Sequence, residues 1–575
     1  MKDMKTIKHI VCSLFIAMGL TGCEDFFDTL PMNEVVLENF WTDKNDVISV
    51  VNSCYESLET EDCMVRMGVW GEMRSDNLKA GSNPSDEMNQ ILKENILPSN
   101  SMCNWLIFYQ TINRCNTVCY YAPQVQAIDP NYTESEMRAN IAEASAIRAL
   151  CYFYLIRTFR DVPYTTQPSI DDSQNYVLPA TPFNDVLDSL IINLESVKDN
   201  AVSRYYLDDS PSAYQNSSRI TRVAIWAILA DLYLWKGDWD NCIKYCDMVL
   251  DFKRKQYDDM LEREGTITNI ALFGNIPMIL EKPSGSNTWG NSYNEIFGEG
   301  NSFESLFELY FTTGQSRMNT WVGKYYGGNN NNTVGICGAP DFLRQDVPTG
   351  QNSLFKKIDG RAYASVAMES QTYYPRKYYY QSVSFSTQSV TAESSLNFSA
   401  SSRSSEDANW IFYRLSDAIL MKAEALIQRG AADTLADRTA SDYAQAFHLI
   451  NTVNKRAIDA SPISSRADTL KMADYVNSRI EMENLLLEER QREFLFEGKR
   501  WFDLVRTARR DGSNSRLSTL ATRKYIENVN AIKIRLANPN RIYFPYFRNE
   551  LKVNPLLKQN SAYADTEDTE LTTKK

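Results

Sequence analysis

Apolar residues recur at helical spacing through most of the N-terminal half of the chain. One stripe consists of Val47, Val50, Val51, Cys54, Tyr55 and Leu58. The 3.6-residue period of an α-helix places these six positions on one face. The same period runs through residues 104–122, and residues 141–159 form a strong helical pattern that ends before Pro163. The pattern therefore predicts a mainly α-helical protein.

Residues 221–250 predict a helical hairpin. One helix is expected over 221–235 and a second over 239–250, with a turn at Gly237. The first helix carries small residues at Ala224, Ala227 and Ala230. Small residues let antiparallel helices approach closely, and the spacing resembles a tetratricopeptide hairpin. Because similar segments occur at 142–163, 413–430 and 441–457, we expect a tetratricopeptide-like scaffold of several degenerate hairpins.

The helical period fades between residues 255 and 407. Glycine, asparagine and serine gather there around two tryptophans, Trp289 and Trp321. A long irregular stretch inside a compact protein is usually functional or disordered, and its aromatic content argues against disorder. We therefore expect an inserted, loop-rich, irregular region carried by the helical scaffold.

The N-terminus predicts a secretory signal. Lys2, Lys5 and Lys8 precede an apolar run over residues 10–20, which is too short to span a bilayer of about 30 Å as a helix. The run ends in Leu-Thr-Gly-Cys at residues 20–23, which resembles a bacterial lipobox. We expect residues 1–22 to be a lipoprotein signal peptide and Cys23 to be lipidated. An ordinary signal peptide with an incidental cysteine is the alternative.

Composition narrows the possible functions. The formal net charge is −13 and acidic and basic residues are mixed along the chain, which disfavours a nucleic-acid partner. His9 and His448 are the only histidines, so a histidine-based catalytic triad or zinc site is disfavoured. We expect His448 to pack in a helix, and Cys115/Cys119 and Cys242/Cys246 to be buried thiols rather than metal ligands or disulfides.

Four C-terminal motifs occur in a specific order. They are NWIFYRLSDAILMKAEALIQRG (409–430), AFHLINTVNKRA (446–457), LLLEERQREFLFEGKRWFDLVR (485–506) and RIYFPYFRNELKVNPLLKQNSAY (541–563). With RSDN at residues 74–77, they make the chain resemble the SusD/RagB family of outer-membrane nutrient-binding lipoproteins. The resemblance divides the mature chain into an N-terminal helical part (23–254), a loop-rich variable insert (255–407) and a C-terminal part that completes the scaffold (408–575).

The resemblance implies a function without catalysis. The protein is expected to be lipid-anchored and cell-surface exposed on the outer membrane. It would bind an oligosaccharide and deliver it to a SusC-like TonB-dependent transporter, with no cofactor and no metal. An oligopeptide-binding protein of the RagB type is the alternative. A surface glycosidase with two carboxylates is the contrasting class.

The third motif contains charges at helical spacing. Glu489 and Arg492 are three residues apart, as are Arg490 and Glu493, so opposite charges can meet on one helix surface. We expect a buried ion-pair network that joins two helices rather than an acid–base site, with Gly498 in a left-handed conformation after the helix.

A sugar site needs flat aromatic rings together with hydrogen-bonding side chains. Three stretches offer this combination, and their candidate ligand-binding residues are Trp289 and Tyr293, Trp321 and Tyr325, and Trp70, Arg74 and Asn77. Glycine- and asparagine-rich surroundings are expected to leave the indoles of Trp289 and Trp321 exposed. Core packing is the alternative for Trp70.

Overall fold

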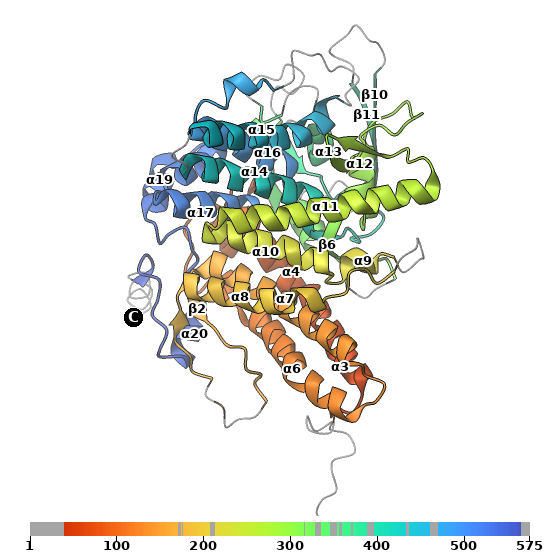
Figure 1. Ribbon diagram of the computed structural model, residues 1–575. Helices are drawn as coiled ribbons and strands as arrows, with labels where there is room; N and C mark the ends of the chain where they lie inside the picture. The colour runs from red at the N-terminus through yellow and green to blue at the C-terminus, as the bar shows by residue number, and fades with distance from the viewer. Residues whose placement is uncertain are drawn as a thin grey trace, which may run out of the picture.

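The chain folds into stacked helical pairs with small strand pairs on one side (Figure 1). The computed structural model describes residues 40–170, 174, 176–206, 213–314, 317–327, 335–344, 353–355, 359–369, 372–387, 396–432, 436–459 and 470–564. The expected signal peptide and Cys23 lie outside these residues. Within the described part, no helix is both long enough and apolar enough to cross a membrane.

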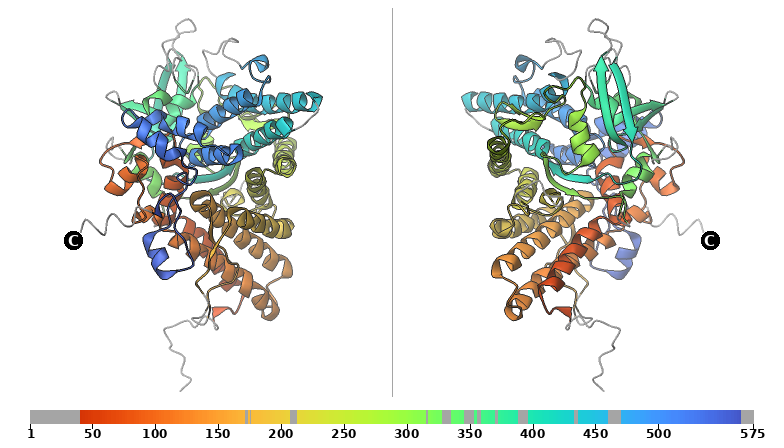
Figure 2. Two further views of the ribbon diagram at one scale, coloured as in Figure 1. Left: turned by 90° about the vertical axis from the view of Figure 1, so that its left-hand side faces the viewer. Right: turned by 90° about the vertical axis from the view of Figure 1, so that its right-hand side faces the viewer.

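Long helices make up the scaffold. They are α3 (Lys44–Leu58), α6 (Leu106–Ile128), α7 (Glu134–Phe159), α8 (Phe183–Val197), α10 (Arg222–Lys236), α11 (Trp239–Glu264), α14 (Leu415–Ala432), α15 (Ala436–Asp459), α16 (Arg479–Glu493) and α17 (Arg500–Asp511). Helices α6 and α7, α10 and α11, and α14 and α15 pack as pairs. The side views in Figure 2 show these pairs along one edge of the molecule. The mainly helical, tetratricopeptide-like fold is thus confirmed.

Shorter helices connect and cover the scaffold. They are α4 (Glu61–Gly68), α5 (Asp86–Leu92), α9 (Gln215–Ser218), α12 (Asn291–Tyr293), α13 (Arg361–Ser365), α18 (Ser515–Ala521), α19 (Val529–Ala537) and α20 (Arg548–Val553).

The hairpin of α10 and α11 shows why these residues form helices. Thr221 caps α10, because its side chain accepts a hydrogen bond from the amide of Ala224. Gly237 ends the helix at φ +80°, a left-handed conformation that glycine adopts without steric cost. Ala224, Ala227 and Ala230 are fully buried, as close helix packing requires. Helix α11 continues to Glu264, beyond the expected end at residue 250.

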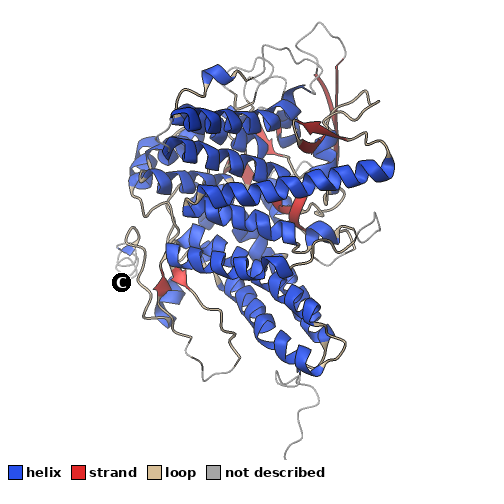
Figure 3. Cartoon of the chain, in the orientation of Figure 1, coloured by secondary structure: helices blue, strands red, loops and turns tan. Residues whose placement is uncertain are grey.

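The middle region contains more regular structure than the sequence pattern indicated. Its strands form antiparallel pairs, apart from the bulk of the helices (Figure 3). They are β4 (Ile270–Phe273) with β5 (Ile276–Ile279), β8 (Val366–Glu369) with β9 (Thr372–Pro375), and β10 (Tyr380–Thr387) with β11 (Leu396–Ser402). Strands β10 and β11 do alternate apolar and polar residues, as at Val383 and Phe385, but the glycine, asparagine and serine content of the region suggested irregular structure instead.

Other strand pairs join distant parts of the chain. Strand β6 (Ser305–Leu309) pairs with β12 (Trp410–Arg414), which leads directly into α14. Strands β1 (Lys79–Ala80) and β7 (Cys337–Gly338) pair, as do β2 (Val162–Pro163) and β3 (Ala180–Thr181). The β6–β12 pair fixes the middle region to the C-terminal helices.

A buried ion-pair network surrounds Glu493 at the end of α16. The Glu493 carboxylate accepts hydrogen bonds from Arg414 (2.6 Å), Arg456 (2.6 Å) and Arg361 (2.8 Å). Burial alone would raise the pKa of Glu493, but these three guanidinium groups hold it well below its usual value. The carboxylate is therefore a structural charge that stays ionised.

The network differs in detail from the sequence expectation. Glu489 and Arg492 do pair, at 2.9 Å. Arg490, however, pairs with Asp503 of α17 at 2.8 Å rather than with Glu493. Gly498 has the expected left-handed φ of +72°, and it lies in the turn between α16 and α17. A Cβ atom there would lie 2.7 Å from Cζ2 of Trp410, so close packing also requires glycine.

Candidate functional site

Trp289 is the predicted site residue that stays accessible. Its indole is half-buried and lies under the ammonium group of Lys282, 4.6 Å from the ring centroid. The Trp289 backbone exchanges hydrogen bonds with Phe385 of β10. The nearby Tyr293 ring is buried, and its hydroxyl donates to the carbonyl of Lys377. Contact with a ligand therefore remains a prediction for Trp289, whereas the Tyr293 ring has a structural role.

The expectation that Trp321 is exposed is wrong. Its side chain is 0% exposed and stacks on buried Tyr325, with ring centroids 4.4 Å apart. Gly68 of α4 makes room for the indole, because a Cβ at residue 68 would lie 2.2 Å from Cδ2 of Trp321. This glycine lies far away in the sequence, so the local glycine- and asparagine-rich context gave no sign of the burial.

Trp70, Arg74 and Asn77 are also buried and bind other parts of the protein. The Trp70 indole packs against Phe108 (4.8 Å), which agrees with the core alternative. Arg74 forms an ion pair with Glu94 at 2.6 Å and lies over the Trp501 ring. Asn77 accepts a hydrogen bond from Gln491 of α16. These residues fix the N-terminal part to the C-terminal motifs, and the three predicted stretches do not converge on one open site.

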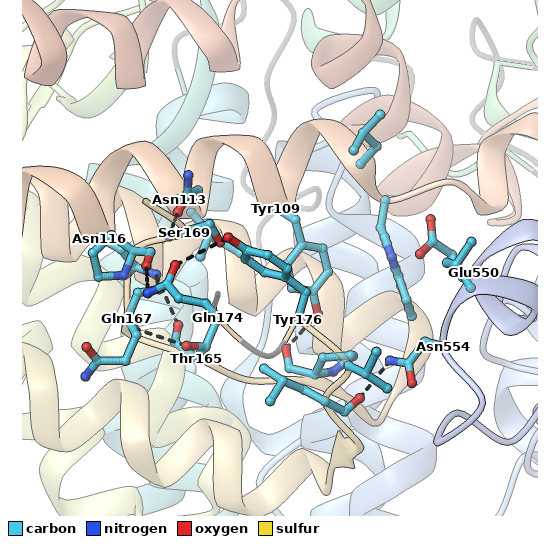
Figure 4. Close-up of a pocket in the computed structure, with 18 of the residues that line it drawn as sticks. Tyr109, Asn113, Asn116, Thr165, Gln167, Ser169, Gln174, Tyr176, Glu550 and Asn554 are labelled. Carbon is cyan, nitrogen blue, oxygen red and sulfur yellow. Dashed lines mark hydrogen bonds between the residues drawn. The ribbon is translucent and has the colours of Figure 1, made fainter. Parts of the chain in front are cut away.

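An open groove lies instead between α6, the described residues of the segment that follows Val162 (163–169, 174 and 176–178) and α20, and it is shown in Figure 4. We call it the amide groove. Its volume is about 400 Å³, within the usual range of small-molecule sites. Aromatic and aliphatic side chains form much of its wall, namely Trp105, Leu106, Tyr109, Ile112, Tyr176, Val177, Leu178, Val553 and Leu557. Tyr176 is 52% exposed, so its ring offers a flat apolar surface.

Amide side chains shape the groove by holding residues 167–169 and Leu178 in place. Tyr109, Asn113 and Asn116 follow one face of α6. The Asn113 side chain accepts from the amide of Ser169 (2.7 Å), and Asn116 donates to the carbonyl of Gln167 (3.1 Å). From the other side, Asn554 donates to the carbonyl of Leu178 (2.8 Å). The loop is thus fixed from two helices, which preorganises the groove.

The amide groove carries little charge. Glu550 is the only ionisable acid or base other than tyrosine among the described residues that line it. Burial raises the pKa of Glu550, although a hydrogen bond with Trp105 opposes the shift. A neutral ligand with apolar faces and hydroxyl groups fits such a wall better than a charged ligand does.

The sequence contained a weak sign of this groove. Aromatic and amide residues share one face of α6, and a polar segment of threonine, glutamine and serine follows the Asp-Val-Pro-Tyr motif at residues 161–164. The contribution of α20 could not be foreseen, since it comes from a segment nearly 400 residues further along the chain.

Few of the described residues could act in catalysis or bind a metal ion. Among the described residues, no group of three histidine, cysteine or acidic side chains could hold a metal ion. His448 is exposed on α15, so the expected packing of its ring is wrong. The described cysteines are free thiols, and all but the half-buried Cys119 are buried, as expected. Burial raises the pKa of Cys63, Cys103 and Cys151, which disfavours a reactive thiolate at these positions.

Comparison with known proteins identifies the family. The model of the SusD family matches residues 279–563. SusD-like protein P38 of Formosa agariphila is 23% identical over 585 residues, which cover 98% of this chain and 100% of the relative. A crystal structure of a SusD superfamily protein from Bacteroides vulgatus aligns with a TM-score of 0.61 and 18% identity, over 91% of this chain and 100% of the other.

A second Bacteroides vulgatus structure, described as a putative sugar binding protein, aligns with a TM-score of 0.59 and 19% identity, over 92% of this chain and 100% of the other. Residues 279–563 thus belong to the SusD family, and SusD-like relatives align over nearly the whole chain. This is a glycan-binding, outer-membrane-associated family that is not catalytic.

Proposed function

We propose that the protein is a cell-surface lipoprotein that binds a neutral oligosaccharide in the amide groove and delivers it to a SusC-like TonB-dependent transporter. The observation that carries the proposal is the exposed ring of Tyr176 in a preorganised groove with amide walls and a single carboxylate. Pyranose rings have apolar C–H faces that pack on aromatic rings, and their hydroxyls bond to amides and backbone groups.

Membrane attachment in this proposal depends on Cys23. Its support is the lipobox-like sequence at residues 20–23 and the outer-membrane association of the family. Several buried acyl chains, at about 0.8 kcal/mol for each CH₂, are enough for stable anchoring. The variant Cys23→Ala should no longer be found in the membrane fraction. If it sediments with membranes as the wild type does, the lipid anchor is refuted.

Binding without chemistry is the second part of the proposal. Its support is the state of the acidic motif in α16, where Glu489 and Glu493 are both buried and paired with arginines. A carboxylate held in such a network has no free proton to donate and no open path to a glycosidic bond.

The test is a binding screen with a matched pair of variants. Purified protein is titrated with neutral oligosaccharides, uronate-containing oligosaccharides and oligopeptides. Tyr176→Ala should weaken neutral-glycan binding by about tenfold, because aromatic anchors often contribute that much at a binding surface. Tyr120→Ala is the control, since Tyr120 is 45% exposed but lies outside the groove.

Each alternative gives a different result. Binding of peptides but no glycan would replace the proposal with the peptide-binding function. Release of reducing sugar from a bound glycan would indicate an enzyme. Equal affinities of the wild type and Tyr176→Ala would show that the ligand does not bind in the amide groove.

A further inference from the structure

A second groove lies between the C-terminal end of α3, α9 and the end of β6. We call it the tyrosine groove. Its volume is about 730 Å³, and its described lining residues are Ile48, Asn52, Tyr55, Glu56, Glu59, Tyr214, Gln215, Ser218, Arg219, Tyr310 and Arg317. Figure 1 shows α9 and α20 on opposite sides of the molecule, so this groove is separate from the amide groove.

Two tyrosines form a rigid aromatic surface in this groove. Tyr214 and Tyr310 stack with ring centroids 4.4 Å apart and an interplanar angle of 23°. Tyr310 directly follows β6, whose last residue Leu309 pairs with Trp410 of β12. Both rings are half-buried, so they hold their position and still offer surface to a ligand. Because each ring covers one face of the other, an outer ring face of this stack is the surface that a pyranose C–H face can pack against.

Most charges in the tyrosine groove are already paired. Arg219 forms an ion pair with Glu143 at 2.7 Å, and the Tyr55 hydroxyl donates to the same carboxylate. Arg317 donates to the backbone carbonyl of Glu56 and lies 3.5 Å from its carboxylate. These contacts fix the positions of both guanidinium groups.

Glu59 is the exception in the tyrosine groove. Its carboxylate accepts no hydrogen bond from the described residues and has no described cation within 4.0 Å. Burial raises the pKa of Glu59 to about 7, against a lowering effect of Arg317 and with a further increase from Glu56. Glu59 is half-buried, so burial removes part of its hydration without giving the carboxylate a donor from the described residues. A ligand that brings hydroxyl donors would supply the missing hydrogen bonds.

We propose that the tyrosine groove is a second binding site, which takes a neutral pyranose ring packed on an outer face of the Tyr214–Tyr310 stack, with vicinal hydroxyls donating to Glu59. Arg317 and Arg219 also line the groove, but both are already held in ion pairs within the protein. Glu59 is therefore the group that selects the ligand, and it favours hydroxyl donors over anions. The second site rests on the proposed glycan-binding function, and it adds a second point of attachment on another face.

The experiment counts sites with calorimetry. Wild-type protein is titrated with neutral gluco-, xylo-, manno- and galacto-configured hexasaccharides and with oligogalacturonate. The best neutral hexasaccharide should occupy two sites in each chain. At pH 8, above the raised pKa of Glu59, Tyr310→Ala and Glu59→Gln should each weaken one site by tenfold or more, because hydrogen bonds to a charged group are among the strong ones. Tyr176→Ala should weaken only the other site.

The control and the contrary results separate the two sites. Glu61→Gln is the control, since Glu61 lies on α4 outside both grooves and pairs with Lys324. One wild-type site that is lost in Tyr176→Ala and unchanged in Tyr310→Ala and Glu59→Gln would overturn this inference alone. One site that is lost in Tyr310→Ala and kept in Tyr176→Ala would support the tyrosine groove and refute the amide groove. Binding of none of the neutral sugars would overturn both.

Discussion

Glu493 and Glu59 are the same residue type in opposite settings. Glu493, in the scaffold, accepts hydrogen bonds from three arginines, and its pKa lies well below the usual value. Glu59, at the edge of the tyrosine groove, has no described partner, and burial raises its pKa to about 7. Desolvation on its own raises the pKa of both carboxylates. The difference therefore comes from the partners, which distinguish a structural charge from one that is available to a ligand.

The largest effect should come from breaking the scaffold network. Glu493→Gln leaves Arg361, Arg414 and Arg456 short of a buried counter-charge. We expect a loss of about 3–5 kcal/mol in the free energy of unfolding, measured by urea titration, and no change in any glycan turnover. Glu488→Gln is the control, because Glu488 is exposed on the same helix. A loss below about 1 kcal/mol for Glu493→Gln would show that the network is not structural.

The two tryptophans of the middle region should behave differently. Trp321→Ala removes a fully buried indole and should cost about 3–5 kcal/mol in unfolding free energy. Trp289→Ala removes a half-buried indole outside both grooves, so the fold should persist with a smaller loss of unfolding free energy. Thermal unfolding and calorimetry of both variants test this. Equal stability losses would show that Trp289 is a core residue as well.

Close helix packing gives an intermediate effect. Ala227→Leu adds volume at a fully buried position of α10, which should cost about 1–3 kcal/mol through overpacking. The change leaves every charge in place, so it isolates packing from electrostatics. Thermal unfolding that matches the wild type would show that the α10–α11 hairpin tolerates a bulky residue there.

The smallest effect should be the pH dependence of Glu59. Because folding raises its pKa from 4.5 to about 7, the stability that its protonated form contributes is present below about pH 4.5 and is lost as pH rises through about 7. Glutamine stays neutral, so Glu59→Gln should match the wild type near pH 4.5. At pH 8 it should be more stable, by about 1 kcal/mol at most, because the groove is open to solvent. Melting curves at both pH values, with Glu61→Gln as control, decide this. A pH-independent difference would contradict the unpaired state of Glu59.

The scaffold was predictable because helical hairpins depend on local patterns. The small residues of α10 and the turn at Gly237 lie next to each other in the sequence, and the structure confirms both. The Glu–Arg spacing of α16 also indicated burial correctly. The Glu489–Arg492 pair followed from the spacing, but the partners of Glu493 did not, because Arg361 lies 132 residues from it.

The grooves, in contrast, could not be predicted from local patterns. Each forms where distant segments meet, such as Tyr109 of α6 with Val553 of α20, or Glu59 just after α3 with Tyr310 after β6. Aromatic residues in glycine-rich sequence suggested exposure, yet Gly68 on α4 gives Trp321 a buried position. Local composition thus identified ring types but not which rings face solvent.

The most direct measurement is a crystal structure of the protein with the best neutral oligosaccharide of the screen. The account predicts an intact, uncleaved glycan with a sugar ring against Tyr176 in the amide groove, while Glu493 stays bound to its three arginines. A cleaved glycan, or a ligand whose sugar rings contact neither Tyr176 nor the Tyr214–Tyr310 pair, would contradict it.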